Sequence, residues 1–154
     1  MSNPPVANLD PADRILIDDL LARYSRAFDH ADLDAFLDVF VEDGVFDSEM
    51  TGTFTGKAQL TEFFNDLNNN PDYPLRRDGQ HWITNLIFTE VEEDRVEMWS
   101  SFMFLIAPDG EVRVSVMGEY DDTFVKRDGR WLFARRGIRV SGDREAKLAP
   151  AFKK

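Results

Sequence analysis

The chain offers few side chains that exchange protons near neutral pH: it contains two histidines, His30 and His81, and no cysteine. His81 falls in the segment Gln-His-Trp-Ile-Thr-Asn (80–85), where β-branched and aromatic residues indicate a strand. Alternation along that strand puts four side chains on one face: His81, Ile83, Asn85 and Ile87. If this face is concave, we expect the histidine and the asparagine to point into one cavity. A histidine that is simply hydrogen-bonded within the sheet is the alternative interpretation.

Asp29 is the candidate partner of a catalytic histidine, because it ends the first expected helix directly after Phe28. A carboxylate there lies near the negative end of the helix dipole, where it is mildly disfavoured. It could receive the histidine N–H, fix the tautomer and raise the basicity of the ring, or it could be an exposed turn residue. Tyr24 lies five residues earlier, roughly 140° around an ideal helix. Its hydroxyl therefore either reaches the same cavity or belongs to the core.

The last expected strand carries three arginines, Arg135, Arg136 and Arg139. Strand alternation places Arg136 on one face and the other two on the opposite face, unless a bulge intervenes. A guanidinium that faced the cavity would stabilise an oxyanion, whereas an arginine on the outer face would be solvated.

The sequence contains no pattern typical of a metal or cofactor site. The spacing of His30, Asp32 and Asp34 suits a strand better than the start of a helix, and an N-cap role for Asp32 accounts for it. The absence of cysteine excludes disulfides, thiolate nucleophiles and Cys-based metal sites. No phosphate-binding glycine loop or serine nucleophile elbow is found. We therefore expect neither a metal nor an organic cofactor.

The first half of the chain has the hydrophobic spacing of helices. One helix is expected from Asp10-Pro11 to Asp29 or His30, and a second, capped by Asp32, through Phe40. A third is expected over 56–67, after a short strand over 53–55. Extended structure is expected to begin at Val45.

The second half is rich in β-branched and aromatic residues. Turn signals divide it into four expected strands, over 80–92, 95–107, 111–127 and 130–140. Hairpins between strands of this length predict a strongly curved, mostly antiparallel sheet. Three helices followed by such a sheet indicate an α+β fold with the helices on one face.

Length and composition describe one globular domain. The 154 residues include 18 Lys and Arg against 29 Asp and Glu, which gives a formal net charge of −11 and disfavours binding to nucleic acid or anionic membranes. The first nine residues are expected to be a disordered lead-in, residues 10–140 the domain, and residues 141–154 a charged tail. No secretory signal or long apolar run is visible, so we expect a cytoplasmic protein.

Several local sequences, in this order, resemble the SnoaL-like family of the nuclear-transport-factor-like superfamily, whose members form a cone-shaped α+β barrel. The match begins with the first two expected helices, Tyr-Ser-Arg-Ala-Phe-Asp-His-Ala-Asp-Leu-Asp-Ala-Phe-Leu-Asp-Val-Phe (24–40). It continues through Asp-Gly-Val-Phe (43–46), Gly56 with its helix, and the segment around His81. Gly-Glu-Tyr-Asp-Asp-Thr-Phe (118–124) and Gly-Arg-Trp-Leu-Phe-Ala-Arg-Arg (129–136) complete it.

Within this superfamily the chain is most similar to a branch that contains scytalone-type dehydratases, a bile-acid dehydratase and a lindane dehydrochlorinase. Those enzymes use an Asp–His dyad without a metal or organic cofactor: the histidine removes a proton, and a leaving group departs. Asp29 and His81 match the dyad positions, and Tyr24 matches the tyrosine of the steroid dehydratase. Arg136 or Arg139 matches an arginine near the final strand.

The resemblance implies a lyase that carries out β-elimination on a small apolar cyclic or ketone-bearing substrate. Phe28, Trp82 and Asn85 are the candidates for contacting that substrate. The superfamily commonly buries the outer face of its sheet in dimers or trimers, so we expect a homodimer or homotrimer.

Two other functions remain open in the sequence. A ketosteroid-type isomerase shares the fold and would need Asp47 or Asp43 as its base. A structural subunit, similar to the small subunit of aromatic-ring dioxygenases, would bind a larger catalytic partner and would itself catalyse nothing.

Overall fold

A computed structural model describes residues 8–70 and 79–142 of the chain. Its elements follow one another as three helices interleaved with two strands, and then four long strands. They are α1 (Pro11–Asp29), α2 (Leu33–Asp38), β1 (Phe40–Ser48), β2 (Gly52–Thr55), α3 (Gly56–Asn69), β3 (Gly79–Val91), β4 (Arg95–Ile106), β5 (Arg113–Arg127) and β6 (Arg130–Val140).

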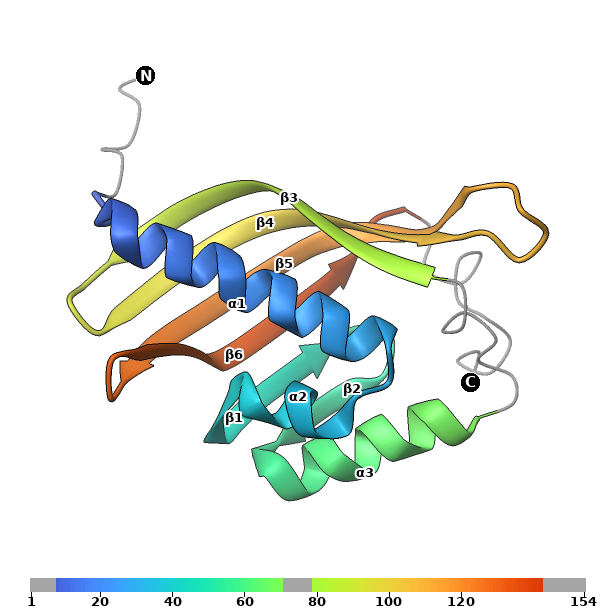
Figure 1. The fold of residues 1–154 in the computed structure, drawn as a ribbon, viewed down its shortest axis with the longest axis horizontal. Coiled ribbons are helices and arrows are strands. Elements are labelled where there is room, and N and C mark those ends of the chain that lie inside the picture. Colours follow the sequence, from blue (N-terminus) through green and yellow to red (C-terminus); the bar gives the residue numbers. More distant parts are fainter. Residues whose placement is uncertain (1–7, 71–78, 143–154) are drawn as a thin grey trace.

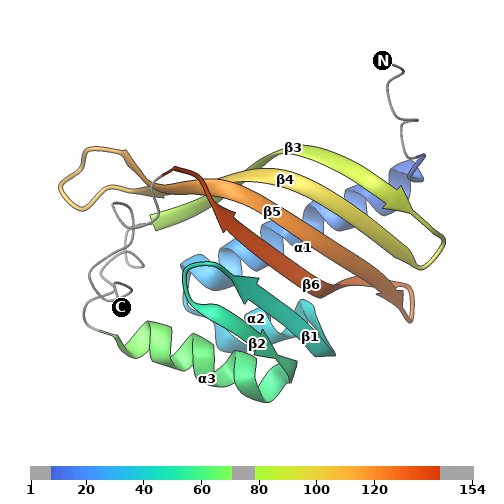
Figure 2. The ribbon, with the colours of Figure 1, turned by 180° about the vertical axis from the view of Figure 1, so that it is seen from behind.

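The strands form one six-stranded sheet in the order β2-β1-β6-β5-β4-β3. Neighbouring strands are antiparallel except for β1 and β6, which run parallel. Figure 1 shows α1 lying across the curved sheet. It shows α2 and α3 beside β1 and β2. Figure 2 shows the opposite face of the sheet, which no helix of the described chain covers. The expected α+β fold, with three helices on a curved and mostly antiparallel sheet, is confirmed.

The helix starts depend on the two expected caps. The Asp10 side chain accepts the N–H of Ala12 at 2.8 Å, and the Asp32 side chain accepts the N–H of Ala35 at 3.0 Å. The first helix ends at Asp29, as expected.

The second helix is shorter than expected, because it ends at Asp38 and Phe40 already belongs to β1. Phe40 is paired with Phe133 of β6, and its ring is buried against that residue. The sheet pairing and the burial of this ring outweigh the helical spacing of the local sequence. The expected start of extended structure at Val45 was therefore five residues late, and the pairing of β1 with β6 shifts register between Phe40 and Val45.

The core lies between α1, α2, α3 and the inner face of the sheet, and it is rich in aromatic rings. One stripe of α1 is buried there, as its spacing predicts: Ile17, Leu20, Leu21, Tyr24, Ala27 and Phe28. Gly118 of β5 has no room for a side chain, because a Cβ would lie 2.0 Å from the carbonyl oxygen of Arg139 and 2.9 Å from the Phe102 ring. This glycine lets Phe102 stack on Tyr120 with ring centroids 4.3 Å apart.

The expected alternation along β3 is wrong beyond Thr84. Asn85 has a φ of 56°, and the pairing of β3 with β4 shifts register between Thr84 and Ile87. After this bulge Leu86 and Phe88 pack against the core, whereas Ile87 is 55% exposed. Asn85 consequently does not share the inner face with His81.

Most of the expected lead-in (1–9) and of the expected tail (141–154) lies outside the described residues, because the structure does not describe residues 1–7 and 143–154. Leu9, within the expected lead-in, packs against the core. None of the helices in the described part of the chain is long and apolar enough to cross a membrane.

Candidate active site

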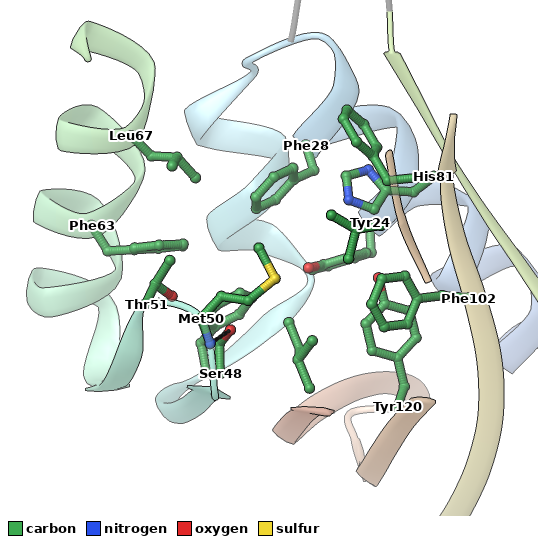
Figure 3. A pocket seen from close by; sticks show the side chains of 14 residues that line it. Tyr24, Phe28, Ser48, Met50, Thr51, Phe63, Leu67, His81, Phe102 and Tyr120 are labelled. Carbon is green, nitrogen blue, oxygen red and sulfur yellow. Dashed lines mark hydrogen bonds between the residues drawn. The ribbon is translucent and has the colours of Figure 1, made fainter. Parts of the chain in front are cut away.

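A pocket opens between the helices and the inner face of the sheet, with about 480 Å³ of space that includes its open mouth. Its wall is mainly apolar, and these residues come from two helices, four strands and the turn after β1: Phe28, Phe46, Met50, Phe63, Leu67, Phe102, Phe104, Val116 and Ile138. Five polar side chains complete the lining: Tyr24, Ser48, Thr51, His81 and Tyr120. Figure 3 shows His81 beside Phe28 on one side of the cavity, and Ser48 and Thr51 on the other. A small, mostly apolar molecule fits such a lining.

Asp29 and His81 meet at the edge of this pocket. The Nδ1 atom of His81 lies 2.5 Å from the Oδ1 atom of Asp29, and the two side chains are 13% and 10% exposed. The backbone N–H of His81 also donates to the carboxylate of Asp29, with distances of 3.0 and 3.3 Å to its two oxygens. The end of α1 thus holds both the backbone and the ring of His81.

This contact determines which nitrogen of His81 faces the pocket. An ionised carboxylate only accepts hydrogen bonds, so Nδ1 must carry the proton in the contact with Asp29. In the neutral ring Nε2 is then unprotonated, and it makes no hydrogen bond to another described residue. The Phe28 and Phe104 rings pack against the imidazole, with centroids 5.1 and 4.4 Å away, and fix its orientation. The arrangement presents a basic nitrogen to the cavity.

Two buried tyrosines stand near His81. Tyr24 and Tyr120 are each 1% exposed, and their rings lie edge to face with centroids 6.4 Å apart. Figure 3 shows the Tyr24 hydroxyl pointing into the cavity. Burial raises the pKa of Tyr24 to about 12 and the pKa of Tyr120 well above its ordinary value. Both phenols therefore stay protonated at neutral pH and are able to donate a hydrogen bond.

Arg136 lies behind the tyrosines in a fully buried ion pair with Asp122. Its Nε and Nη2 atoms donate to the two carboxylate oxygens at 2.9 and 2.7 Å, and both side chains are 0% exposed. The guanidinium carbon lies 4.1 Å from the ring centroid of Tyr24 and 3.8 Å from that of Tyr120. Burial raises the pKa of Asp122, and the Arg136 guanidinium opposes that rise. The pair holds a positive charge against the rings of two pocket tyrosines.

Arg139, the other candidate arginine, lies on the opposite face of the sheet. Its Nη2 atom is 3.0 Å from the Asp47 carboxylate, which Arg135 also contacts at 2.8 Å. The hydrogen bonds from Arg139, Thr53 and Arg135 lower the pKa of Asp47 to about 2, although burial opposes this shift. Arg136 is therefore the arginine that reaches the pocket tyrosines, and Arg139 is not.

Asp47, the first candidate for the base of an isomerase, lies on the same outer face of the sheet as Arg139. Asp47 lies between Phe46 and Ser48, which both line the pocket, so strand alternation turns its carboxylate away from the cavity. A carboxylate with a pKa near 2 is also a weak base. Asp43, the second candidate, is exposed.

Of the three residues expected to contact the substrate, one lines the pocket and two do not. Phe28 lines the pocket. Trp82 is 55% exposed and donates from its ring nitrogen to Gln80 at 3.2 Å, because its neighbour His81 occupies the inner face. Asn85 is exposed, and its amide donates to Ser101 at 3.4 Å. Neither Trp82 nor Asn85 belongs to the pocket lining.

Sequence reasoning missed the buried partner of Arg136 and the far end of the pocket. The signal for Asp122 was available, because it alternates with Gly118, Tyr120 and Phe124 and thus stands at an inward position where a lone carboxylate is costly. Ser48 and Thr51, which lie at the end of β1 and in the following turn, carried no such signal. Residues 8–70 and 79–142 contain no group of three or more acidic or histidine side chains arranged to hold a metal ion.

Comparison with known proteins identifies the family. A family model described as the SnoaL-like domain matches residues 11–137. No protein among those with curated functions matches the chain. Many solved structures do match, and they include two proteins of unknown function.

Among the matched structures are three with a functional description. A hexachlorocyclohexane dehydrochlorinase of Novosphingobium barchaimii is 25% identical, with a TM-score of 0.67, over 85% of this chain and 88% of that one. A proposed scytalone dehydratase of Novosphingobium aromaticivorans is 22% identical, with a TM-score of 0.71, over 85% of each chain. The beta subunit of a proposed aromatic-ring-hydroxylating dioxygenase from the same species is 22% identical, with a TM-score of 0.70, over 90% of this chain and 95% of that one. At 22% identity, the last two show the fold alone.

The buried ion pair generates a prediction on stability. Asp122→Leu leaves the Arg136 charge buried without a partner, and we expect the free energy of unfolding to fall by about 3–5 kcal/mol. The double variant Asp122→Leu/Arg136→Met removes both charges and should recover most of that loss. Urea unfolding at neutral pH measures all three proteins. A double variant as unstable as Asp122→Leu would show that the loss does not come from the unpaired charge.

Proposed function

Because the chain belongs to the SnoaL-like family, we propose that it is a lyase of the dehydratase type in which His81 and Asp29 form the catalytic dyad. The observation that carries this proposal is the 2.5 Å contact between the His81 ring and the Asp29 carboxylate at the edge of an apolar pocket. The dehydrochlorinase among the matched structures supports an elimination reaction.

The proposed reaction begins at the Nε2 atom of His81. This nitrogen takes a proton from a carbon next to a carbonyl group of the substrate, and Asp29 stabilises the imidazolium that forms. The electron pair of the broken C–H bond becomes the second bond between that carbon and its neighbour. A hydroxyl group on the neighbouring carbon departs and leaves as water with a proton returned by the imidazolium.

Tyr24 and Arg136 act on the charge that develops on oxygen. The Tyr24 phenol stays protonated at neutral pH, so it donates a hydrogen bond to the enolate oxygen or to the departing hydroxyl group. Arg136 contacts the Tyr24 and Tyr120 rings, so its positive charge stabilises negative charge that develops on a substrate oxygen at that side of the pocket. In this mechanism Tyr24 contacts the substrate and Arg136 is a positioning residue.

The isomerase alternative has less support, because Asp47 is turned away from the pocket and Asp43 is exposed. The structural-subunit alternative leaves the dyad and the apolar pocket without a role. A small-molecule reaction accounts for both features, and we propose it for that reason.

The proposal predicts an elimination that depends on the dyad. Against a panel of cyclic β-hydroxy ketones, the protein should form an α,β-unsaturated ketone, which is followed by its ultraviolet absorbance. His81→Gln should reduce kcat/KM by about 10²- to 10⁴-fold, because positioned acid–base catalysis is lost. Asp29→Asn should also lower kcat/KM. The control is His30→Gln, which changes an exposed histidine and should react at the wild-type rate.

Two outcomes would contradict this mechanism. A His81→Gln variant that still eliminates at the wild-type rate would exclude His81 as the base. A wild-type protein that exchanges the acidic hydrogen with deuterated water but never eliminates would favour an isomerase.

We also propose that the outer face of the sheet joins two or three copies of this chain. Cross-strand pairing places Trp82, Met103 and Met117 in one row on that face. Trp82 is 55% and Met117 47% exposed, so the row presents apolar surface that a second copy would bury.

Light scattering at micromolar concentration should therefore give the mass of a dimer or trimer. Trp82→Ser/Met117→Ser should shift the protein to the monomer, because it removes apolar area from the row. Val112→Ser changes an equally apolar residue that is 73% exposed and lies between β4 and β5, and it should leave the mass unchanged. A wild-type monomer would refute this assembly.

A further inference from the structure

Two hydroxyl groups at the far end of the pocket have unused hydrogen-bonding capacity. The Ser48 Oγ atom accepts the backbone N–H of Met50 at 3.1 Å, and its own O–H donates to no described residue. Ser48 is 6% exposed. The Thr51 Oγ1 atom is buried and has no hydrogen-bond partner in the described part of the chain. Buried polar atoms in native proteins are nearly always satisfied, so the Thr51 hydroxyl requires an explanation.

Both hydroxyls belong to the pocket and lie away from the dyad. Ser48 ends β1, and Thr51 follows it in the turn before β2, whereas His81 comes from β3 at the other edge of the sheet. Figure 3 shows the two hydroxyls across the cavity from His81, with Met50 and Phe63 beside them. The wall between the two ends is made chiefly of aromatic rings and aliphatic side chains.

The lining also limits what these hydroxyls could bind. None of the described lining residues is a lysine, arginine, aspartate or glutamate. A carboxylate or phosphate group would lose its hydration in this pocket and would find no positive side chain among the described lining residues to pair with. Burying an unpaired charge costs much free energy. A neutral oxygen, such as that of a hydroxyl or carbonyl group, would accept hydrogen bonds from both side chains at no such cost.

We propose that Ser48 and Thr51 bind a second, neutral oxygen of the substrate, on the end opposite the carbon that His81 deprotonates. The substrate is then an uncharged, mainly apolar ring compound that carries an oxygen at each end. This assignment rests on the proposed function for the reacting end, but binding at the far end does not require catalysis. Ser48 and Thr51 are specificity-determining residues in this account.

The test compares two bicyclic ketones in binding experiments. Hydroxytetralone carries a phenolic hydroxyl on the ring opposite its ketone, and α-tetralone lacks that hydroxyl. The wild-type protein should bind hydroxytetralone about 5- to 10-fold more tightly, the ratio that one net hydrogen bond supplies. Thr51→Val keeps the shape of the side chain and removes the hydroxyl, so this preference should fall; in Ser48→Ala/Thr51→Val it should disappear. NMR titration measures each dissociation constant.

Matched variants separate this inference from folding effects and from the proposed reaction. Thr53→Val removes a hydroxyl that donates to Asp47 on the outer face, and it should keep the wild-type preference. His81→Gln should also keep the preference, because that variant loses the base and retains the far end of the pocket. Thermal unfolding checks that each variant folds.

Three results would overturn the assignment. They are failure of both ketones to bind the wild-type protein, equal wild-type affinity for the two ketones, and an unchanged preference in a folded Ser48→Ala/Thr51→Val variant. If His81→Gln keeps the preference while no β-hydroxy ketone is eliminated by the wild-type protein, the binding assignment stands and the proposed reaction fails.

Discussion

The contact between Asp29 and His81 is the constraint on which the candidate site depends. It joins residues 52 positions apart in sequence and fixes the last residue of α1 to the start of β3. Because β3 is an edge strand, its outward N–H groups lack a strand partner, and the Asp29 carboxylate satisfies the one on His81. One carboxylate therefore links the end of α1 to the sheet, satisfies one N–H of the edge strand and holds the proton on the ring nitrogen that faces away from the cavity.

A second ionic interaction, between Arg136 and Asp122, places a buried positive charge next to the two tyrosines of the same pocket. Arg136 and Asp122 neutralise each other at complete burial, yet the guanidinium lies against the Tyr24 and Tyr120 rings while the carboxylate bonds to its Nε and Nη2 atoms. An apolar cavity of low dielectric strengthens the effect of such a fixed charge on nearby hydroxyls. The pocket thus combines a base, two protonated phenols and a buried cation without exposing a formal charge to the ligand.

Much of this arrangement could be predicted from the sequence, because its signals are local. Asp10 and Asp32 are N-cap residues that mark where the first two helices begin. Turn residues divide the second half of the chain into its four strands. What could not be predicted depends on pairing between distant segments. The partner strand decides that Phe40 is extended, and the bulge after Thr84 turns Asn85 away from the inner face.

The site residues also fall into those that local sequence could predict and those that required the pairing of distant strands. Asp29, His81 and Tyr24 could be singled out from residue type, position and resemblance, and the structure brings them to one pocket. The choice between Arg136 and Arg139 needed the register of β6, and the Asp122 partner needed the pairing of β5 with β6. Thr51 could not have been found, since nothing in a turn sequence shows that a hydroxyl is buried without a partner.

The central claim is that Asp29 holds the proton on Nδ1 of His81 and so leaves Nε2 free to act as a base. Nitrogen NMR of protein labelled at the histidine rings tests it directly, with His30→Gln used to assign the two histidines. We predict that neutral His81 carries its proton on Nδ1, and that Asp29→Ala removes this preference. A wild-type His81 protonated on Nε2 in its neutral form would contradict the account, because the nitrogen that faces the pocket would then be unable to accept a proton.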